Sequence, residues 1–308
     1  MNPVPTFSVI INCLNAEKYL REAIDSVYAQ TFSDWEIILW DNCSTDDTAG
    51  IAKGYDERLR YFKGEKTIPL GAARNRAIEK SQGRFIAFLD SDDWWFEKRM
   101  EKSLQAFSEE KIGLVYANCS IVYSNGKEKT LYPDDWEPPR GKIFEKLMEH
   151  PFINFQSVVV RRDLLSCMDH WFDESLEVAE DLDFLLRFSL LADAVGLPEK
   201  LCSYRIHSES FTWSKSGLFI EEKLRILDKL EASSALSGEQ RKSREGRFLR
   251  SSYKTHGIGC AYLGNRSEAL ANLLAVDRKD FKVVCLIVMI LLLPSSLMKI
   301  IIERRFFS

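Results

Sequence analysis

The chain has 308 residues, of which 45% are hydrophobic and 29% are charged, and its formal net charge at pH 7 is −4. This length predicts one large domain with additions, and the negative balance argues against a nucleic-acid binder that relies on a basic surface. The seven cysteines form no C-x-x-C pair, which is typical of a reducing compartment and predicts neither a disulfide framework nor a zinc site. Because residues 1–8 lack the basic and apolar regions of a signal peptide, we expect a cytoplasmic protein.

The first part of the chain predicts alternating strands and helices joined by short connections. Apolar residues recur at i, i+3, i+4 and i+7 from Leu20 to Val27, and Asn15 is placed to cap this helix. Alternation of this kind predicts an α/β domain with a parallel, doubly wound sheet. The expected strands cover residues 7–11, 36–40, 59–62 and 85–89, and the expected helices cover residues 20–27, a short stretch reaching Lys53, and residues 70–80.

After residue 93 the alternation loosens. A Pro- and Trp-rich loop at 132–139 is of a type that often shapes a substrate pocket, although packing is the simpler role for any one of its residues. From Leu218 the composition becomes helical and charged, and residues 262–270 resemble one helix-turn-helix unit. We predict helices at 96–107 and 180–191 and strands at 113–116, 154–160 and 197–206, with a hairpin-like segment at 121–123 turning at Asn125-Gly126.

The C-terminal segment is unusually apolar. Residues 283–298 contain no charge and are interrupted by Pro294. Sixteen helical residues span about 24 Å, which is less than the ~30 Å of a bilayer core. Basic residues flank both ends, so the charge pattern favours no direction of crossing. We expect a helix that lies in the inner leaflet, and the alternative is a C-terminal helix packed on the protein.

Three carboxylates follow the most apolar strand, at Asp90, Asp92 and Asp93. Ligands of parallel sheets collect where the strands end, and carboxylates packed there resist ionisation unless a cation holds them. Mg²⁺ or Mn²⁺ suits an all-oxygen site that leaves room for substrate phosphates. The alternative is an acidic loop that caps a helix beginning near Trp95.

Other polar side chains are predicted at the same edge of the sheet. Asn12 and Asn15 follow the first strand, Asp41 and Ser44 follow the second, and Arg74 lies on the helix before the buried strand. Singly, Asp41 is explained as a turn former and Arg74 as a surface charge. Together these side chains predict a nucleotide pocket with an adjoining metal site.

The ordered motifs of residues 7–215 resemble those of family 2 glycosyltransferases with the GT-A fold. The resemblance implies a mixed, mainly parallel sheet flanked by helices, a nucleotide-sugar donor and a Mn²⁺ or Mg²⁺ cofactor. The D-x-D signature alone is weak, whereas the ordered set is specific. The matching segments are the opening strand and turn at 8–15, the D-[DN]-x-S-x-D segment at 41–46, the G-x-x-x-A-R-N-type helix start at 71–75, and the D-x-D signature with an extra Asp at 88–93.

Two later segments extend the resemblance and imply roles for their residues. Asp181 of Glu180-Asp181 is implied to be the catalytic base that takes the acceptor proton, and the alternative is a first-turn acid favoured by the helix dipole. Residues 204–210 resemble the family's Y-R-x-H-x-x-S tail, which implies that His207, with Asp92, completes the metal site. Arg205 is implied to assist at the diphosphate, while Asp41 contacts the base and Asp90 meets ribose or sugar hydroxyls.

The resemblance implies an inverting transferase that moves a sugar, most simply from a UDP-sugar, to a hydroxyl of a saccharide or lipid-linked saccharide in surface polysaccharide or lipopolysaccharide synthesis. Residues 186–188 lack the Q-x-x-R-W of processive relatives, so a single addition is expected. The alternatives are a sugar-phosphate nucleotidyltransferase and a non-catalytic nucleotide-sugar-binding scaffold. We expect a catalytic domain at 1–215, a helical extension at 216–277, and a membrane-associated segment at 278–308 on the cytoplasmic face, with no nucleic-acid partner.

Overall fold

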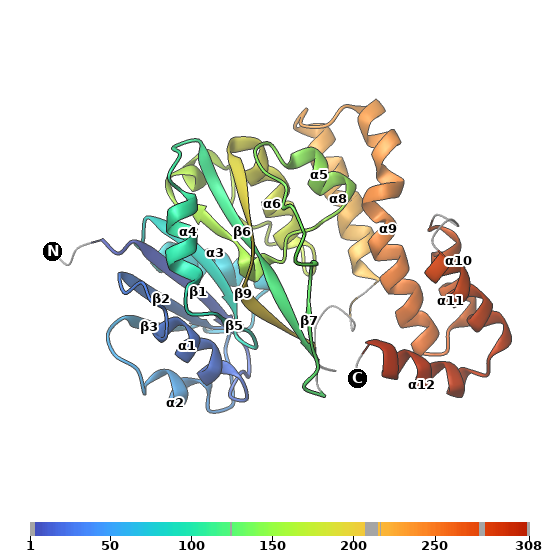
Figure 1. Ribbon diagram of the computed structural model, residues 1–308, viewed down its shortest axis with the longest axis horizontal. Coiled ribbons are helices and arrows are strands. Elements are labelled where there is room, and N and C mark those ends of the chain that lie inside the picture. Colours follow the sequence, from blue (N-terminus) through green and yellow to red (C-terminus); the bar gives the residue numbers. More distant parts are fainter. Residues whose placement is uncertain (1–3, 124, 207–214, 216, 277–280, 307–308) are drawn as a thin grey trace. The chain divides into compact units, whose positions relative to one another are not determined.

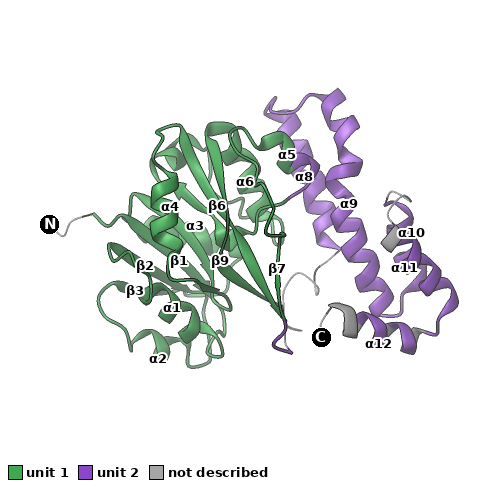
Figure 2. Ribbon diagram, viewed as in Figure 1, with its two compact units in different colours: residues 1–122, 128–147, 152–205 green, residues 123–127, 148–151, 206–308 purple. Residues whose placement is uncertain are grey.

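The computed structural model describes residues 4–123, 125–206, 215, 217–276 and 281–306 (Figure 1). The chain forms two compact units (Figure 2). The first unit comprises residues 1–122, 128–147 and 152–205, and the second comprises residues 123–127, 148–151 and 206–308. The segment 278–308 thus belongs to the same compact unit as the helices that precede it.

The first unit is built on one mixed sheet with the strand order β3-β2-β1-β4-β8-β6-β9-β5, and β7 pairs with β6. The strands β1 to β4 are parallel, whereas β8 runs antiparallel to β4 and β6, as does β5 to β9. Their bounds are β1 (Phe7–Cys13), β2 (Trp35–Asp41), β3 (Leu59–Lys63), β4 (Phe85–Asp90), β5 (Trp94–Trp95), β6 (Ile112–Tyr123), β7 (Glu128–Thr130), β8 (Val159–Arg161) and β9 (Asp193–Ile206).

Helices flank this sheet, as Figure 1 shows. Within the first unit they are α1 (Leu20–Tyr28), α2 (Thr48–Ala52), α3 (Leu70–Lys80), α4 (Arg99–Ala106), α5 (Phe144–Glu149, whose last two residues belong to the second unit) and α6 (Glu180–Leu191), with short 3₁₀ turns η1 (Phe155–Ser157) and η2 (Asp163–Cys167). The predicted helices at 70–80 and 180–191 are confirmed to the residue.

The strands are apolar on both faces because each face is covered. Alternate residues of β4 point to opposite faces of the sheet. On one face, Phe85, Ala87 and Leu89 pack against the apolar face of α1, whose Leu20, Ala23, Ile24 and Val27 are all buried. On the other face the ring of Phe88 contacts an aromatic cluster of Phe155, Phe172 and Phe184, with centroids 4.6–6.0 Å away. This cluster ties η1 and α6 to the central strand.

Several predicted element bounds were wrong. The helix expected from residue 96 begins at Arg99, because Trp94 and Trp95 pair with β9 instead. The strand expected at 154–160 is a 3₁₀ turn followed by β8. The strand at 113–116 and the hairpin segment at 121–123 form one strand, β6, which pairs with β7 across the turn at Gly126, where φ is +80°.

The second unit is helical, with α8 (Leu218–Ala232), α9 (Gly238–Tyr262), α10 (Arg266–Leu274), α11 (Phe281–Leu292) and α12 (Ser295–Phe306). Ser237 and Gln240 form a capping box at the start of α9. The predicted helix-turn-helix around 262–270 is confirmed, and Gly264 makes its turn with a φ of +84°. Among the described residues, no helix combines the length and apolar character that crossing a bilayer requires.

Candidate active site

Parallel pairing brings the ends of three strands of the first unit together. In the β1–β4 register Asn12 lies opposite Asp90, and in the β1–β2 register Cys13 lies opposite Asp41. The sequence prediction that these polar residues share one edge of the sheet is therefore correct in its geometry. The Nδ2 atom of Asn12 is buried there without a hydrogen-bond partner among the described residues, so it is a donor available to a ligand.

The loops after β1 and β2 are hydrogen-bonded to each other. The backbone N–H of Asn15 donates to Ser44 Oγ at 2.8 Å, and the backbone N–H of Thr45 donates to Asn15 Oδ1 at 2.9 Å. Asn15 has a φ of +51°, a conformation that asparagine tolerates better than most residues. The expectation that Asn15 caps the first helix was wrong, because its side chain holds the neighbouring loop and Tyr19 is the N-cap of α1.

Asp41 is completely buried, and both of its oxygens accept hydrogen bonds. Ser44 donates its backbone N–H to Oδ1 at 2.7 Å, and Tyr61 donates its hydroxyl to Oδ2 at 2.6 Å. Burial, followed by the hydrogen bond to Asp41, raises the pKa of Tyr61 above its ordinary value. The turn-forming alternative for Asp41 is therefore part of its role, and no sequence pattern singled out Tyr61 as its partner.

Arg74 is not a surface charge, because only 5% of it is exposed. It projects from α3, and its guanidinium donates to Glu180 Oε1 at 2.7 Å and to Asp90 Oδ1 at 3.3 Å. The guanidinium carbon also lies 4.6 Å from the ring centroid of Phe155. Arg74 thus joins the carboxylate at the end of β4 to the first turn of α6.

Glu180 was assigned no role from the sequence, yet it is the buried partner of Arg74. Burial raises its pKa to about 8, the positive charge of Arg74 lowers it, and the charge of Asp181 raises it further. The sequence signal was its position directly before Asp181, but only the fold shows that its side chain turns inward to Arg74.

The three aspartates after β4 have different surroundings. Asp93 is 2% exposed and accepts the backbone N–H of Arg205 at 2.7 Å. Burial raises its pKa well above the ordinary value, and the charges of Asp92 and Asp90 add to this. The pKa of Asp90 is raised by desolvation, lowered by Arg74 and raised by Asp92 and Asp181. Its side chain keeps 44% of its surface accessible, so water screens part of that shift.

Arg205 holds the turn that carries Asp92. Its Nε donates to the Asp92 carbonyl oxygen at 2.9 Å, and its Nη2 donates to Glu22 at 2.6 Å. Its guanidinium carbon lies 4.2 Å from the ring centroid of Tyr19 and 4.7 Å from that of Trp94. These contacts position the acidic turn from the end of β9. The expected contact of Arg205 with a diphosphate stays a prediction, and His207 lies outside the described residues.

Asp181 lies in the first turn of α6, and its Oδ1 accepts the backbone N–H of Leu182 at 2.6 Å. The charges of Asp181 and Asp92 both raise the pKa of Asp90. Asp181 and Asp92 are therefore both within electrostatic range of Asp90. Arg74, which donates to both Asp90 and Glu180, brings carboxylates about 90 positions apart in the chain to one end of the sheet.

The carboxylates at this end of the sheet are of the ligand type that a hard divalent cation prefers. Burial is the main cause of the raised pKa values of Asp90 and Asp93, the charges of neighbouring aspartates add to it, and a bound cation would lower both pKa values. The alternative of an acidic loop that merely caps a helix does not hold, because a two-residue strand separates these aspartates from α4.

Comparisons with known proteins agree with this geometry. A family model described as "Glycosyl transferase family 2" matches residues 8–168. The putative teichuronic acid biosynthesis glycosyltransferase TuaG of Bacillus subtilis is 30% identical over 219 residues, which cover 68% of this chain and 83% of TuaG. The Escherichia coli β-1,3-glucosyltransferase WfgD, named for UDP-Glc and α-D-GlcNAc-diphosphoundecaprenol, is 28% identical over 232 residues, or 70% of this chain and 87% of WfgD.

Solved structures show the same fold. The S. aureus TarS 1–349 structure in complex with UDP-GlcNAc has a TM-score of 0.62 and 22% sequence identity, over 97% of this chain and 89% of that chain. The mannosyltransferase PcManGT from Pyrobaculum calidifontis, in complex with GDP-Man and Mn²⁺, has a TM-score of 0.58 at 15% identity, over 98% and 85%. At these identities the likeness shows the fold, and the expected GT-A architecture is confirmed. On the family match and the similarity to TuaG, the chain belongs to the family 2 glycosyltransferases.

Proposed function

We propose that this glycosyltransferase adds a single sugar from a UDP-sugar to a hydroxyl of a saccharide or lipid-linked saccharide, with inversion at the anomeric carbon. The observation that carries the proposal is that Arg74 donates to both Asp90 and Glu180, which brings the first turn of α6, with Asp181, to the end of β4. It supports a site in which one carboxylate serves the donor diphosphate and another serves the acceptor. If Asp181 lay far from the acidic turn, the donor and the acceptor could not share one site.

Asp92, together with His207 beyond the described segment, would hold Mn²⁺ or Mg²⁺. When bound, the ion would stabilise the charge that develops on the leaving diphosphate. The support for Asp92 is its turn, which Arg205 anchors through the Asp92 carbonyl and the Asp93 carboxylate. In our proposal Arg205 is therefore a positioning residue for this turn as well as a contact of the diphosphate.

The donor nucleotide would lie over the ends of β1, β2 and β4. Asn12 would donate its orphaned Nδ2 hydrogen to the donor, since a buried amide without a partner is costly. Asp41 would define the base pocket through the loop that it shares with Ser44, and Asn15 would hold that loop from the opposite side. Asp90, kept in place by Arg74, would accept hydrogen bonds from ribose or sugar hydroxyls.

The acceptor hydroxyl would approach from the side of α6. Asp181 would take the hydroxyl proton while the oxygen forms its bond to the anomeric carbon and the bond to the diphosphate breaks. A single displacement of this kind inverts the anomeric configuration. The missing Q-x-x-R-W pattern at 186–188 supports one addition per encounter.

The relatives' names support the biological setting. TuaG is named for teichuronic acid biosynthesis, and the name of WfgD specifies a UDP-sugar and a diphosphoundecaprenol acceptor. We therefore place this enzyme in cell-surface polysaccharide synthesis, on a lipid-linked acceptor at the cytoplasmic face of the membrane.

A face of α11 supports membrane association. Val284, Val288, Leu291 and Leu292 are 37–75% exposed, whereas Val283, Leu286 and Ile290 on the opposite face are packed in the core of the second unit. One side of α11 therefore packs on the protein, as the alternative predicts, and in our proposal the exposed side faces the inner leaflet. The sequence places Lys282 before this face and Lys299, Arg304 and Arg305 after it, which suits an anionic lipid surface.

A panel of nucleotide-sugars in a thermal-shift assay, with and without Mn²⁺, tests the proposal. We expect the largest stabilisation from one UDP-sugar with Mn²⁺ and none from the sugar phosphate alone. Release of UDP on addition of a lipid-linked acceptor would then establish transfer. Pyrophosphate release from a nucleoside triphosphate and a sugar phosphate would instead establish the nucleotidyltransferase, and donor binding without any turnover would establish the scaffold.

A further inference from the structure

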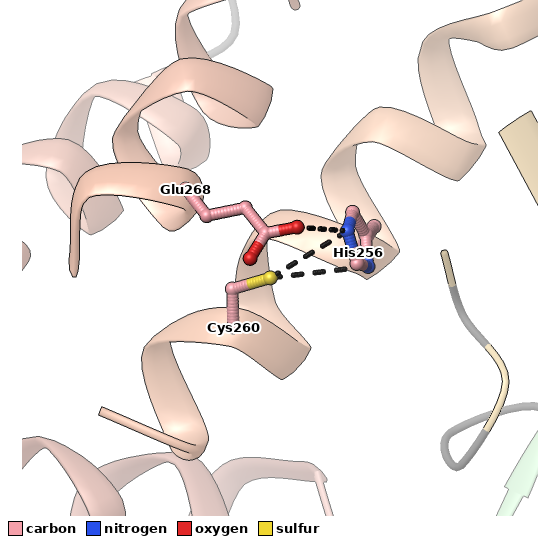
Figure 3. A group of neighbouring side chains, drawn as sticks. All are labelled: His256, Cys260 and Glu268. Carbon is pink, nitrogen blue, oxygen red and sulfur yellow. Dashed lines mark hydrogen bonds and ion pairs between the residues drawn. The ribbon is translucent and has the colours of Figure 1, made fainter. Parts of the chain in front are cut away.

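Three metal-ligating side chains meet in the second unit, in the helical hairpin formed by α9 and α10 (Figure 3). His256 and Cys260 lie one turn apart on α9, and Glu268 lies in the first turn of α10. One ligand atom from each lies within 4.8 Å of the other two. We propose that His256, Cys260 and Glu268 form a site for a zinc-class divalent ion, separate from the carboxylate site of the first unit.

The separations of the ligand atoms suit tetrahedral coordination. Zinc binds sulfur at about 2.3 Å and nitrogen or oxygen at about 2.0–2.2 Å, so two of its ligands lie roughly 3.3–3.6 Å apart. Here Cys260 Sγ lies 3.6 Å from His256 Nε2, and that nitrogen lies 3.1 Å from Glu268 Oε1. Only small side-chain adjustments would bring the three atoms onto one ion, with water as the fourth ligand.

The surroundings hold each ligand in place. Asn265, the N-cap of α10, donates from Nδ2 to Glu268 Oε2 at 2.6 Å, which leaves Oε1 directed at His256 (Figure 3). Such hydrogen bonds to a ligating carboxylate are typical of metal sites. The histidine ring packs against the backbone of Gly217, where an added Cβ would lie 3.1 Å from Cε1 of His256.

The chemistry of the donors selects the ion. A thiolate and an imidazole favour zinc, cobalt or cadmium, whereas Mg²⁺ and Mn²⁺ prefer carboxylates and water. On binding, the Cys260 thiol would give its proton to the solvent. The ion would join α9 to α10 next to the buried cluster that contains Ile258, Ala261 and Ala269, so its expected role is to stabilise this hairpin.

Titration of the chelator-treated full chain with Zn²⁺ in a calorimeter, in the presence of excess Mg²⁺, tests the site. We expect one zinc ion per chain, and titration with Co²⁺ should produce the near-ultraviolet charge-transfer absorption of a cobalt thiolate. Cys260→Ser and His256→Gln should each weaken zinc binding by more than about 100-fold, because losing a direct ligand should cost more than the roughly 10–100-fold typical of losing an outer-shell partner. Cys167→Ser is the matched control, because Cys167 is an exposed free cysteine of the first unit, and it should bind zinc as the wild type does.

Asp92→Asn separates this site from the proposed catalytic metal site. If the variant retains zinc binding with the cobalt thiolate absorption, the ion lies at Cys260 whatever the fate of transferase activity. A cobalt spectrum without thiolate absorption, or equal zinc affinity in the wild type and a Cys260→Ser variant with an unchanged circular dichroism spectrum, would overturn the site. His256 and Glu268 would then form only an ion pair.

Discussion

The guanidinium of Arg74 lies between two carboxylates that belong to distant parts of the chain. One nitrogen is 2.7 Å from Glu180 and the other is 3.3 Å from Asp90. The strand end that carries the acidic turn is thereby coupled to the helix that carries Asp181. Arg74 and Glu180 are both almost fully buried, so the hydrogen bond between them lies in a place that water barely reaches.

Replacing Arg74 by methionine should destabilise the first unit by about 3 kcal/mol, because it leaves the buried Glu180 carboxyl without its hydrogen-bond donor and Asp90 without its cation. Donor binding should weaken as well, since Asp90 loses its anchor. Urea unfolding and calorimetry with UDP-sugars measure the two effects. Arg76→Met on the same helix is the control, because Arg76 is exposed, and it should change the stability by less than about 0.5 kcal/mol. Equal losses in the two variants would contradict this role of Arg74.

Stability should depend on pH through Glu180. Burial raises its pKa in the folded state to about 8 from an ordinary value of 4.5, so the folded protein holds this proton where the unfolded chain has lost it. The contribution of this bound proton to the free energy of unfolding is complete below pH 4.5 and is lost as the pH rises through 8. Glu180→Gln cannot titrate, so the wild type should lose stability relative to this variant between pH 5 and 8.

Unfolding midpoints of the wild type and Glu180→Gln in a pH series measure this difference. Its slope should be at most about 1.4 kcal/mol per pH unit, the limit for a single proton. Asp93 is present in both proteins and its effect cancels, whereas Asp90 shares Arg74 with Glu180 and therefore contributes to the difference. A difference that stays constant from pH 5 to 8 would show that Glu180 is ionised throughout, as half of an ion pair with Arg74.

Asp181→Asn should lower the transfer rate by at least about 100-fold while the affinity for the UDP-sugar changes little, because the variant keeps the shape but cannot take a proton. Single-turnover assays and calorimetry separate the two quantities. The control is Asp169→Asn at an exposed loop position, which should transfer normally. If donor binding fell as far as turnover does, Asp181 would belong to the donor site and the proposed division of roles would be wrong.

Asp92→Asn should remove the part of donor binding that depends on Mn²⁺ and keep the fold, since Arg205 holds the backbone of this turn through the Asp92 carbonyl. Thermal shifts with a UDP-sugar, with and without Mn²⁺, report on it directly. We expect the variant to show the same small shift in both conditions. A full Mn²⁺-dependent shift in the variant would place the cation on other ligands.

The double variant Leu291→Glu/Leu292→Glu should not bind vesicles that contain anionic lipid, whereas the wild type should sediment with them. Charged residues on the exposed face of α11 oppose insertion, and this face contributes nothing to the core of the second unit, so the fold should survive. Leu263→Glu, at an exposed position in the turn before α10, should bind vesicles as the wild type does. Vesicle binding that persists in the double variant would assign the membrane contact to another surface.

Much of the first unit could be predicted because its local patterns agree with its fold. The apolar spacing of Leu20 to Val27 places one face of α1 on the sheet, and the helix expected at 70–80 and the strand expected at 85–89 both form. Parallel strands end at one edge, so the motifs that follow β1, β2 and β4 had to lie close together.

The local predictions that failed depended on partners far away in the chain. The helix was expected to begin at residue 96, directly after Trp94 and Trp95, but β9 offers these two residues backbone partners more than 100 positions later. Asn15 has the chemistry of a helix cap, but the loop after β2 takes its side chain. Neither competition is visible in the neighbouring residues.

The alternation of strands and helices up to β4 and the acidic residues at one edge of the sheet followed from the amino-acid pattern alone, because periodicity and turn chemistry are local properties, and the ordered motifs carried the resemblance to the family. The pairing of Arg74 with Glu180, the inward turn of Asp93 and the meeting of His256, Cys260 and Glu268 were decided only by tertiary packing. The free energy of a buried charge or ligand depends on which distant group reaches it, and that distance exists only once the chain has folded.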